Sequence, residues 1–262
     1  MITKEFDLFY ANALFLKKQY RDAFEEYFSG AIDHHSPQAA FNLAFMYHLG
    51  ISVPRNYMMA HKFYIAASNL DGGEAQFNLA LMYLRGQGVD VDPRRAADYM
   101  KISAARECIN AQLYLGAAYT MGRMFDPMDI ECISLIPFYR VIKRDISSLY
   151  LSGTGHDRQL DDAMYEVFDA DEYDAVEMFE AAAGHKDITY IEEQVGIAKE
   201  TLGHALIEGV GREYAPEKGF KLIEKAAVEH GSKEAALFLN MNKDKAKAYG
   251  IDAAKTKYLI ED

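Results

Sequence analysis

The chain has 262 residues, of which 50% are hydrophobic and 26% charged, and this composition excludes an intrinsically disordered protein. Its formal net charge of -12 argues against a nucleic-acid groove, because such grooves need clustered lysine and arginine. No run reaches the roughly 18 apolar residues of a membrane span, acidic Glu5 and Asp7 interrupt any N-terminal secretory signal, and two cysteines are too few for a disulfide framework. We therefore expect a cytoplasmic protein that binds neither nucleic acid nor membranes.

In chain order, the first regular feature is a set of residues that recur every 36 positions. A recurrence at an interval of about 20 to 50 residues predicts a solenoid of stacked repeats. The recurring residues are Ala39, Ala75 and Ala111; Leu43, Leu79 and Leu115; Tyr47, Tyr83 and Tyr119; and Gly50, Gly86 and Gly122.

The unit around Glu74–Val89 shows how each repeat is built. Its alanine, leucine and tyrosine are spaced i, i+4 and i+8, which places them on one face of a helix. Gly86 is expected to end that helix, because glycine adopts the positive φ of a C-terminal cap at little cost. Asp92 and Pro93 are expected to start the next helix, as its N-cap and first residue. Each unit is thus predicted to be an antiparallel helix pair.

The pattern AxFxLAxxYxxGxGV, followed by AxxYM and small residues, resembles the Sel-one-like repeat, a relative of the tetratricopeptide repeat. The segments Leu202–Gly211 and Gly219–Gly231 are similar to the first and second helices of that family. Residues Tyr10–Ala31 have the shorter turn of an ordinary tetratricopeptide unit. The resemblance implies an all-α fold, a right-handed α-α superhelical solenoid of stacked antiparallel helix pairs.

We therefore predict a single solenoid domain over residues 1–262. Its expected parts are units at about 5–35, 36–71 and 72–107, an irregular unit with an acidic insertion at 108–190, a unit at 191–231, and capping helices at 232–262.

The irregular unit departs from the repeat in two ways. Pro137 falls where the second helix is expected, and we expect a kink or a shortened helix there because an interior proline costs about 3 kcal/mol. Two segments then compete as the second helix, 160–168 and 172–183. Whether residues 124–190 form one irregular repeat or two stays open.

The segment Asp157–Glu180 carries ten carboxylates against one arginine. It lacks the glycine and the bidentate glutamate of a calcium loop, so we predict either a docking surface for a basic partner or a solvated helix face. The predicted docking residues are Asp161, Asp162, Asp169, Asp171, Glu172 and Asp174.

No chemistry of catalysis is indicated. The eight histidines show no metal-ligand spacing, and no nucleophile, base and orienting group can be nominated. We therefore expect no metal, no cofactor and no enzyme activity.

A second stripe of the first helix, turned by about 130° from the packed face, is the predicted binding surface. Related tetratricopeptide units commonly place an asparagine like Asn42 and Asn78 against the backbone of a bound peptide. The alternative is that these asparagines bond a neighbouring helix. The predicted residues are Gln38, Asn42, Phe45, Glu74, Asn78, Leu81, Arg85, Asn110, Tyr114 and Met121.

These features favour a protein–protein interaction scaffold or adaptor that binds a peptide or a helix of another protein in its concave groove. Two alternatives remain: an enzyme or small-molecule receptor with its site at residues 124–190, and a structural solenoid that associates with itself through exposed apolar ends.

Overall fold

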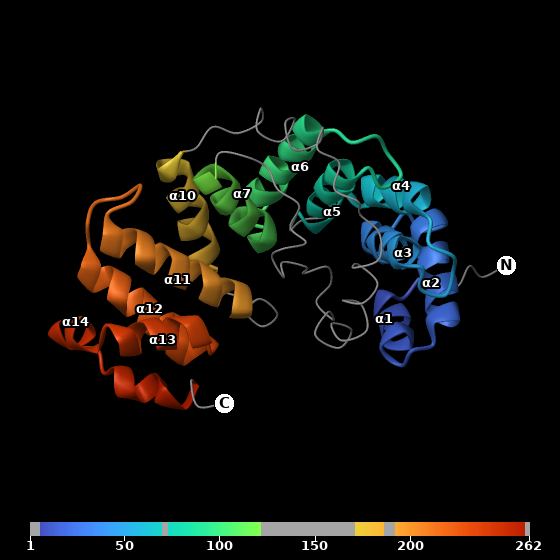
Figure 1. Cartoon of the computed structure of the whole chain (residues 1–262). Helices are drawn as coiled ribbons and strands as arrows, with labels where there is room; N and C mark the ends of the chain where they lie inside the picture. Colours follow the sequence, from blue (N-terminus) through green and yellow to red (C-terminus); the bar gives the residue numbers. More distant parts are fainter. Residues whose placement is uncertain (1–5, 70–72, 122–170, 186–191, 260–262) are drawn as a thin grey trace. The chain divides into compact units, whose positions relative to one another are not determined.

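A computed structural model describes residues 6–69, 73–121, 171–185 and 192–259 (Figure 1). Every regular element in these ranges is a helix, and consecutive helices pack as pairs. This confirms the predicted all-α class and its helix-pair solenoid. Within the same ranges, no helix is both long and apolar enough to cross a membrane.

The described residues fall into two compact units, one that ends at Cys108 and one that begins at Ile109. The first unit contains three helix pairs in chain order, and α2 also packs on α3 and α4 on α5. Its helices are α1 (Leu8–Leu16), α2 (Tyr20–Ile32), α3 (Pro37–Leu49), α4 (Tyr57–Ala67), α5 (Glu74–Arg85) and α6 (Pro93–Ala105).

The turns inside the second and third pairs of the first unit have the same construction. α5 ends at Gly86, with φ 63°, and α6 begins after Asp92, whose side chain accepts a hydrogen bond from the Arg95 amide. The Asp92 amide donates to the Tyr83 carbonyl at 3.0 Å, just as Asn56 donates to Tyr47 at 2.9 Å one repeat earlier. The predicted helix stop and start are therefore confirmed, and both depend on local residues.

Aromatic rings join α3 to α4 and α5 to α6. Tyr47 of α3 stacks on Phe63 of α4 with ring centroids 5.8 Å apart, and Tyr83 of α5 stacks on Tyr99 of α6 at 5.6 Å. Leu43 and Leu79, each four residues before its tyrosine, are fully buried. The residues that recur in sequence are thus the residues that pack.

The second unit begins with α7, and its helices continue in chain order to the C-terminal segment. They are α7 (Ile109–Met121), α10 (Glu172–Ala183), α11 (Glu192–Glu208), α12 (Pro216–His230), α13 (Lys233–Met241), α14 (Lys243–Ala248) and the 3-10 helix η2 (Ala253–Leu259).

α7 and α10 form a helix pair although residues 122–170 separate them in sequence. The Asp171 amide donates to the Tyr119 carbonyl at 3.0 Å, so these two residues stand where Asp92 and Tyr83 stand in the preceding repeat. Phe179 of α10 packs directly on Gly116 of α7, where a Cβ would lie 2.7 Å from the ring. Of the two expected second helices, 172–183 is therefore the one that pairs with α7.

The other expected features of that region, the helix at 160–168 and the kink at Pro137, lie outside the described residues. The division of the chain into numbered repeat units stays a prediction.

α11 and α12 cross closely because each has a glycine at the contact. A Cβ on Gly203 would lie 2.8 Å from the Gly219 carbonyl oxygen, and a Cβ on Gly219 would lie 2.5 Å from the Gly203 carbonyl oxygen. Ile223, fully buried in α12, fills the space beside Gly203. Only residues without a side chain allow this approach.

Candidate functional site

The predicted binding stripe divides by burial into two groups. Its accessible members are exposed or half-buried: Gln38, Asn42, Glu74 and Arg85. Its buried members are Phe45, Asn78, Leu81, Asn110 and Tyr114. The side chain of Met121 lies outside the described part of the chain.

Asn42 is engaged inside the helix stack. Its Nδ2 donates to Oδ1 of Asn12 on α1 at 3.2 Å, and the Tyr27 hydroxyl of α2 donates to the same oxygen at 2.7 Å. Burial raises the pKa of Tyr27, so this hydroxyl keeps its proton and remains a donor. Asn42 thus makes the inter-helix bond that the alternative interpretation describes, and its use by a partner stays a prediction.

Asn78, one repeat further on, is placed differently. It is 1% exposed, and its Nδ2 has no hydrogen-bond partner among the residues that the structure describes. Near it in sequence, half-buried Glu74 opens α5, and burial raises the pKa of its carboxyl. Asn78 is therefore a buried donor with unused bonding capacity.

The two apolar members of the stripe on α3 and α5 belong to the packed interior. Phe45 is 1% exposed, and its ring meets Phe15 of α1 edge to face with centroids 6.5 Å apart. Leu81 is 5% exposed. The period of 100° per residue predicts which residues share a face of a helix. It does not predict how many of these faces are covered by neighbouring helices.

The predicted acidic surface is described only in part. Asp171 is exposed and caps α10 by accepting from the amides of Tyr173 and Asp174. Burial of Tyr119 raises the pKa of its hydroxyl, and the negative charge of the half-buried Asp174 adds to this increase. Asp161, Asp162, Asp169 and the side chain of Glu172 lie outside the described residues, as does most of the 124–190 region of the alternative enzyme or receptor site.

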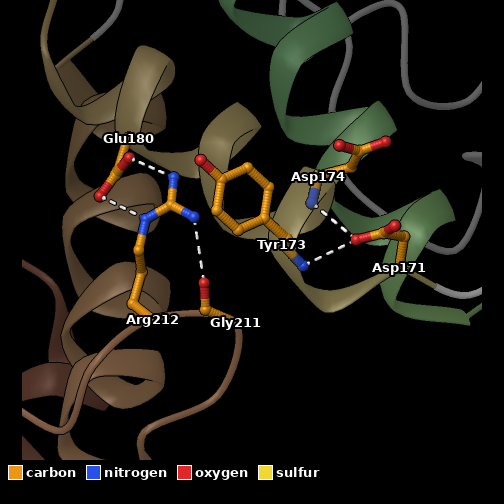
Figure 2. Close-up of polar contacts among 6 residues, drawn as sticks. All are labelled: Asp171, Tyr173, Asp174, Glu180, Gly211 and Arg212. Carbon is orange, nitrogen blue, oxygen red and sulfur yellow. Dashed lines mark hydrogen bonds and ion pairs between the residues drawn. The ribbon is translucent and has the colours of Figure 1, made fainter.

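Arg212 joins the α11–α12 turn to α10, a contact that the sequence analysis missed (Figure 2). Its guanidinium donates from Nη2 and Nε to the Glu180 carboxylate at 2.8 and 3.2 Å, and from Nη1 to the Gly211 carbonyl at 3.0 Å. It also lies over the Tyr173 ring, 4.2 Å from the centroid. One acidic residue of α10 is thus used within the fold. Arg212 lies 32 residues after Glu180 and belongs to no recognised motif, so the sequence carries no signal for this contact.

His48 is the most strongly shifted histidine with a described environment. It lies on α3 with its ring edge to face with Tyr57 and Tyr64 at centroid distances of 5.3 and 6.0 Å. Burial, and to a smaller extent the positive charge of Arg85, lower its pKa to about 3. The imidazole is therefore neutral in the folded protein at neutral pH.

We expect acid to destabilise the fold through His48. The unfolded chain binds this proton below about pH 6.5, whereas the folded protein does not until about pH 3, so stability falls by about 1.4 kcal/mol per pH unit between these values. At pH 5 the loss should be about 2 kcal/mol. Urea unfolding from pH 7 to pH 4 measures it.

The matched variants are His48→Phe, which keeps a ring between the two tyrosines, and His35→Asn at an exposed position. His48→Phe should remove this part of the acid slope, and His35→Asn should leave it in place. An unchanged slope in His48→Phe would contradict the assignment.

The repeats match a known family. The model of the Sel1 repeat matches residues 37–72, 73–108 and 202–227, which cover α3–α4, α5–α6 and the end of α11 with most of α12. No curated protein sequence matches the chain.

Several solved structures are similar to it, and two are described here. A Sel1 repeat protein from Oxalobacter formigenes is 21% identical with a TM-score of 0.65, over 97% of this chain and 83% of that one, which shows the same fold. A protective antigen of uropathogenic Escherichia coli with an SLR fold is 21% identical with a TM-score of 0.35, over 88% of this chain and 53% of that one. Three segments of the chain thus match the Sel1 repeat, and its fold is the one seen in a Sel1 repeat protein.

Proposed function

We propose that this chain is a non-catalytic cytoplasmic scaffold that holds an extended peptide or a helix of a partner protein against the stripe on α3 and α5. Sel1-repeat proteins are commonly interaction scaffolds of this non-catalytic kind. The stripe offers accessible polar residues at Gln38, Asn42, Glu74 and Arg85 in one compact unit.

The observation that carries the proposal is the unused Nδ2 of Asn78. A buried donor without an acceptor costs about 1–3 kcal/mol, and among the described residues this amide nitrogen has none. A backbone carbonyl of a bound segment would supply the acceptor once neighbouring side chains move aside, because this nitrogen is closed to solvent in the unbound protein. An amide side chain suits an extended chain because it donates and accepts at once.

The charges at the two ends of α5 suit a segment bound along that helix. Glu74 and Arg85 are the first and last residues of that helix and carry opposite signs. A bound segment with a basic and an acidic residue at matching ends would meet both. This complementarity sets register more than affinity.

The test compares partners captured from extracts of the native host by the wild-type chain and by Asn78→Leu, followed by measurement of the dissociation constant of the captured protein. Leucine has nearly the same shape but no donor, so folding stability should be unchanged or slightly higher while binding weakens about tenfold. Asn69→Leu, at an exposed asparagine after α4, is the control and should bind normally. If Asn78→Leu and the wild type bound the partner with equal affinity, the stripe would be excluded as the binding surface.

A further inference from the structure

His230, the last residue of α12, makes a short hydrogen bond with a lysine of α11. The side chain of His230 is fully buried, and its Nε2 lies 2.7 Å from Nζ of Lys199. The two helices approach closely here because α11 has a glycine opposite this side chain, and a Cβ on Gly196 would lie 2.8 Å from the His230 Cβ. Lys199 itself is only 16% exposed. The contact is therefore part of the packing between α11 and α12.

This contact fixes which nitrogen of the imidazole carries the proton. A lysine ammonium has three donors and no acceptor. Nε2 of His230 must therefore accept the hydrogen bond, and Nδ1 must hold the single proton of the neutral ring. A protonated imidazole has an N–H on both nitrogens, so it cannot accept from Lys199. The Lys199–His230 bond exists only while His230 is neutral.

Glu229 lies where it can bind the protonated ring instead. Its Oε2 accepts from Lys199 at 3.3 Å and lies 3.8 Å from Nε2 of His230. A movement of about 1 Å would bring this oxygen to the roughly 2.8 Å of a charge-assisted hydrogen bond. The Glu229 side chain is 51% exposed, so solvent leaves room for the movement.

The charges around His230 act on its proton in opposite directions. Burial, and to a smaller extent the positive charge of Lys199, lower the pKa of the imidazole, whereas Glu229 and Glu192 raise it. The net effect is a pKa below the ordinary value of 6.5. On the rest of α11, Glu200 bonds to Ser232. The described charged side chains on α13 and η2, which pack on α12, are exposed: Lys233, Glu234 and Lys255.

We propose that His230 is a pH-sensitive switch in the contact between α11 and α12. On acidification Nε2 binds a proton from solvent and donates to Glu229. The ammonium of Lys199, now beside a second positive charge, loses its acceptor and moves to solvent. The switch belongs to the second unit, so it is independent of the peptide stripe on α3 and α5.

The sign of the effect on stability follows from the lowered pKa of His230. The unfolded chain binds this proton below about pH 6.5, whereas the folded protein binds it only at a lower pH. The stability that the neutral ring contributes is therefore complete above pH 6.5 and is lost as the pH falls toward the pKa of the folded protein.

NMR of the full chain with nitrogen labels on histidine and lysine tests the switch. At neutral pH the His230 ring should be neutral with its proton on Nδ1. The free fraction of Lys199 should rise about tenfold between one pH unit above and one unit below the measured pKa of His230. The exchange rate of its ammonium protons, relative to exposed Lys218, should rise by the same factor. A proton on Nε2 at neutral pH, or a constant ratio of rates, would overturn the proposal.

Two charge variants should move the pKa of His230 in opposite directions. Lys199→Met should raise it, and Glu229→Gln should lower it, because each removes a charge that acts on the ring. The matched control is Lys221→Met, which removes a lysine that pairs with Glu217 at the other end of α12, and it should leave the pKa unchanged. An unchanged pKa in Lys199→Met would count against the switch.

His230→Gln separates the titration of the ring from the presence of an acceptor. The glutamine amide oxygen accepts from Lys199 but binds no proton in this range. The exchange rate of Lys199 relative to Lys218 should therefore be the same above and below the wild-type pKa. A rise as large as in the wild type would show that another group releases the lysine. Circular dichroism checks the fold of each variant, and the wild-type titration decides the proposal even where a variant does not fold.

Discussion

Replacing Gly203 or Gly219 by alanine is expected to lower the free energy of unfolding by about 3 kcal/mol, among the largest effects of any single methyl group in this chain. Each new Cβ would meet the backbone carbonyl of the opposite glycine, at 2.8 Å from Gly203 and 2.5 Å from Gly219. A backbone oxygen cannot rotate away as a side chain can, so α11 and α12 must move apart. Urea unfolding followed by circular dichroism measures the loss.

The matched control is Gly184→Ala at the end of α10. Its φ is ordinary at -84°, and the nearest atom to a new Cβ is the Glu180 carbonyl oxygen at 3.3 Å. It should lose less than about 1 kcal/mol. The variant with both Gly203 and Gly219 replaced should lose less than the sum of the single losses, because one separation relieves both contacts. Single variants as stable as the wild type would show that α11 and α12 cross elsewhere.

Phe45→Ala should cost about 3–5 kcal/mol of folding stability. The ring is 1% exposed and contacts Phe15, so its removal leaves a cavity between α1 and α3. The matched control is Phe9→Ala on α1, where the ring is 85% exposed and the expected change is within about 0.5 kcal/mol. Thermal and urea unfolding of the two variants make the comparison.

The comparison of Phe45→Ala with Phe9→Ala also distinguishes a core role of Phe45 from a binding role. A residue that lined an open groove would tolerate alanine in the fold and would lose partner binding instead. If Phe45→Ala unfolds normally but captures fewer partners, the ring belongs to the binding surface. Loss of stability without a specific binding defect would assign it to the core.

The sequence by itself determined the repeat and its turns. The interval between Tyr47 and Tyr83 predicted equivalent helices, and the residues around Gly86 and Asp92 predicted where one helix stops and the next begins. These features depend on φ preference, capping and helical periodicity, each of which acts within a few residues. The amino-acid order is sufficient for them.

Only the tertiary structure decided which distant residues meet. It paired Asp171 with Tyr119 across residues 122–170, joined Asn42 to Asn12, and set Arg212 on Glu180. It also buried Phe45 and Asn78, which a helical projection had placed outward. Burial and long-range hydrogen bonds depend on how neighbouring helices stack. The periodicity within one helix does not predict which residues of other helices will pack against it.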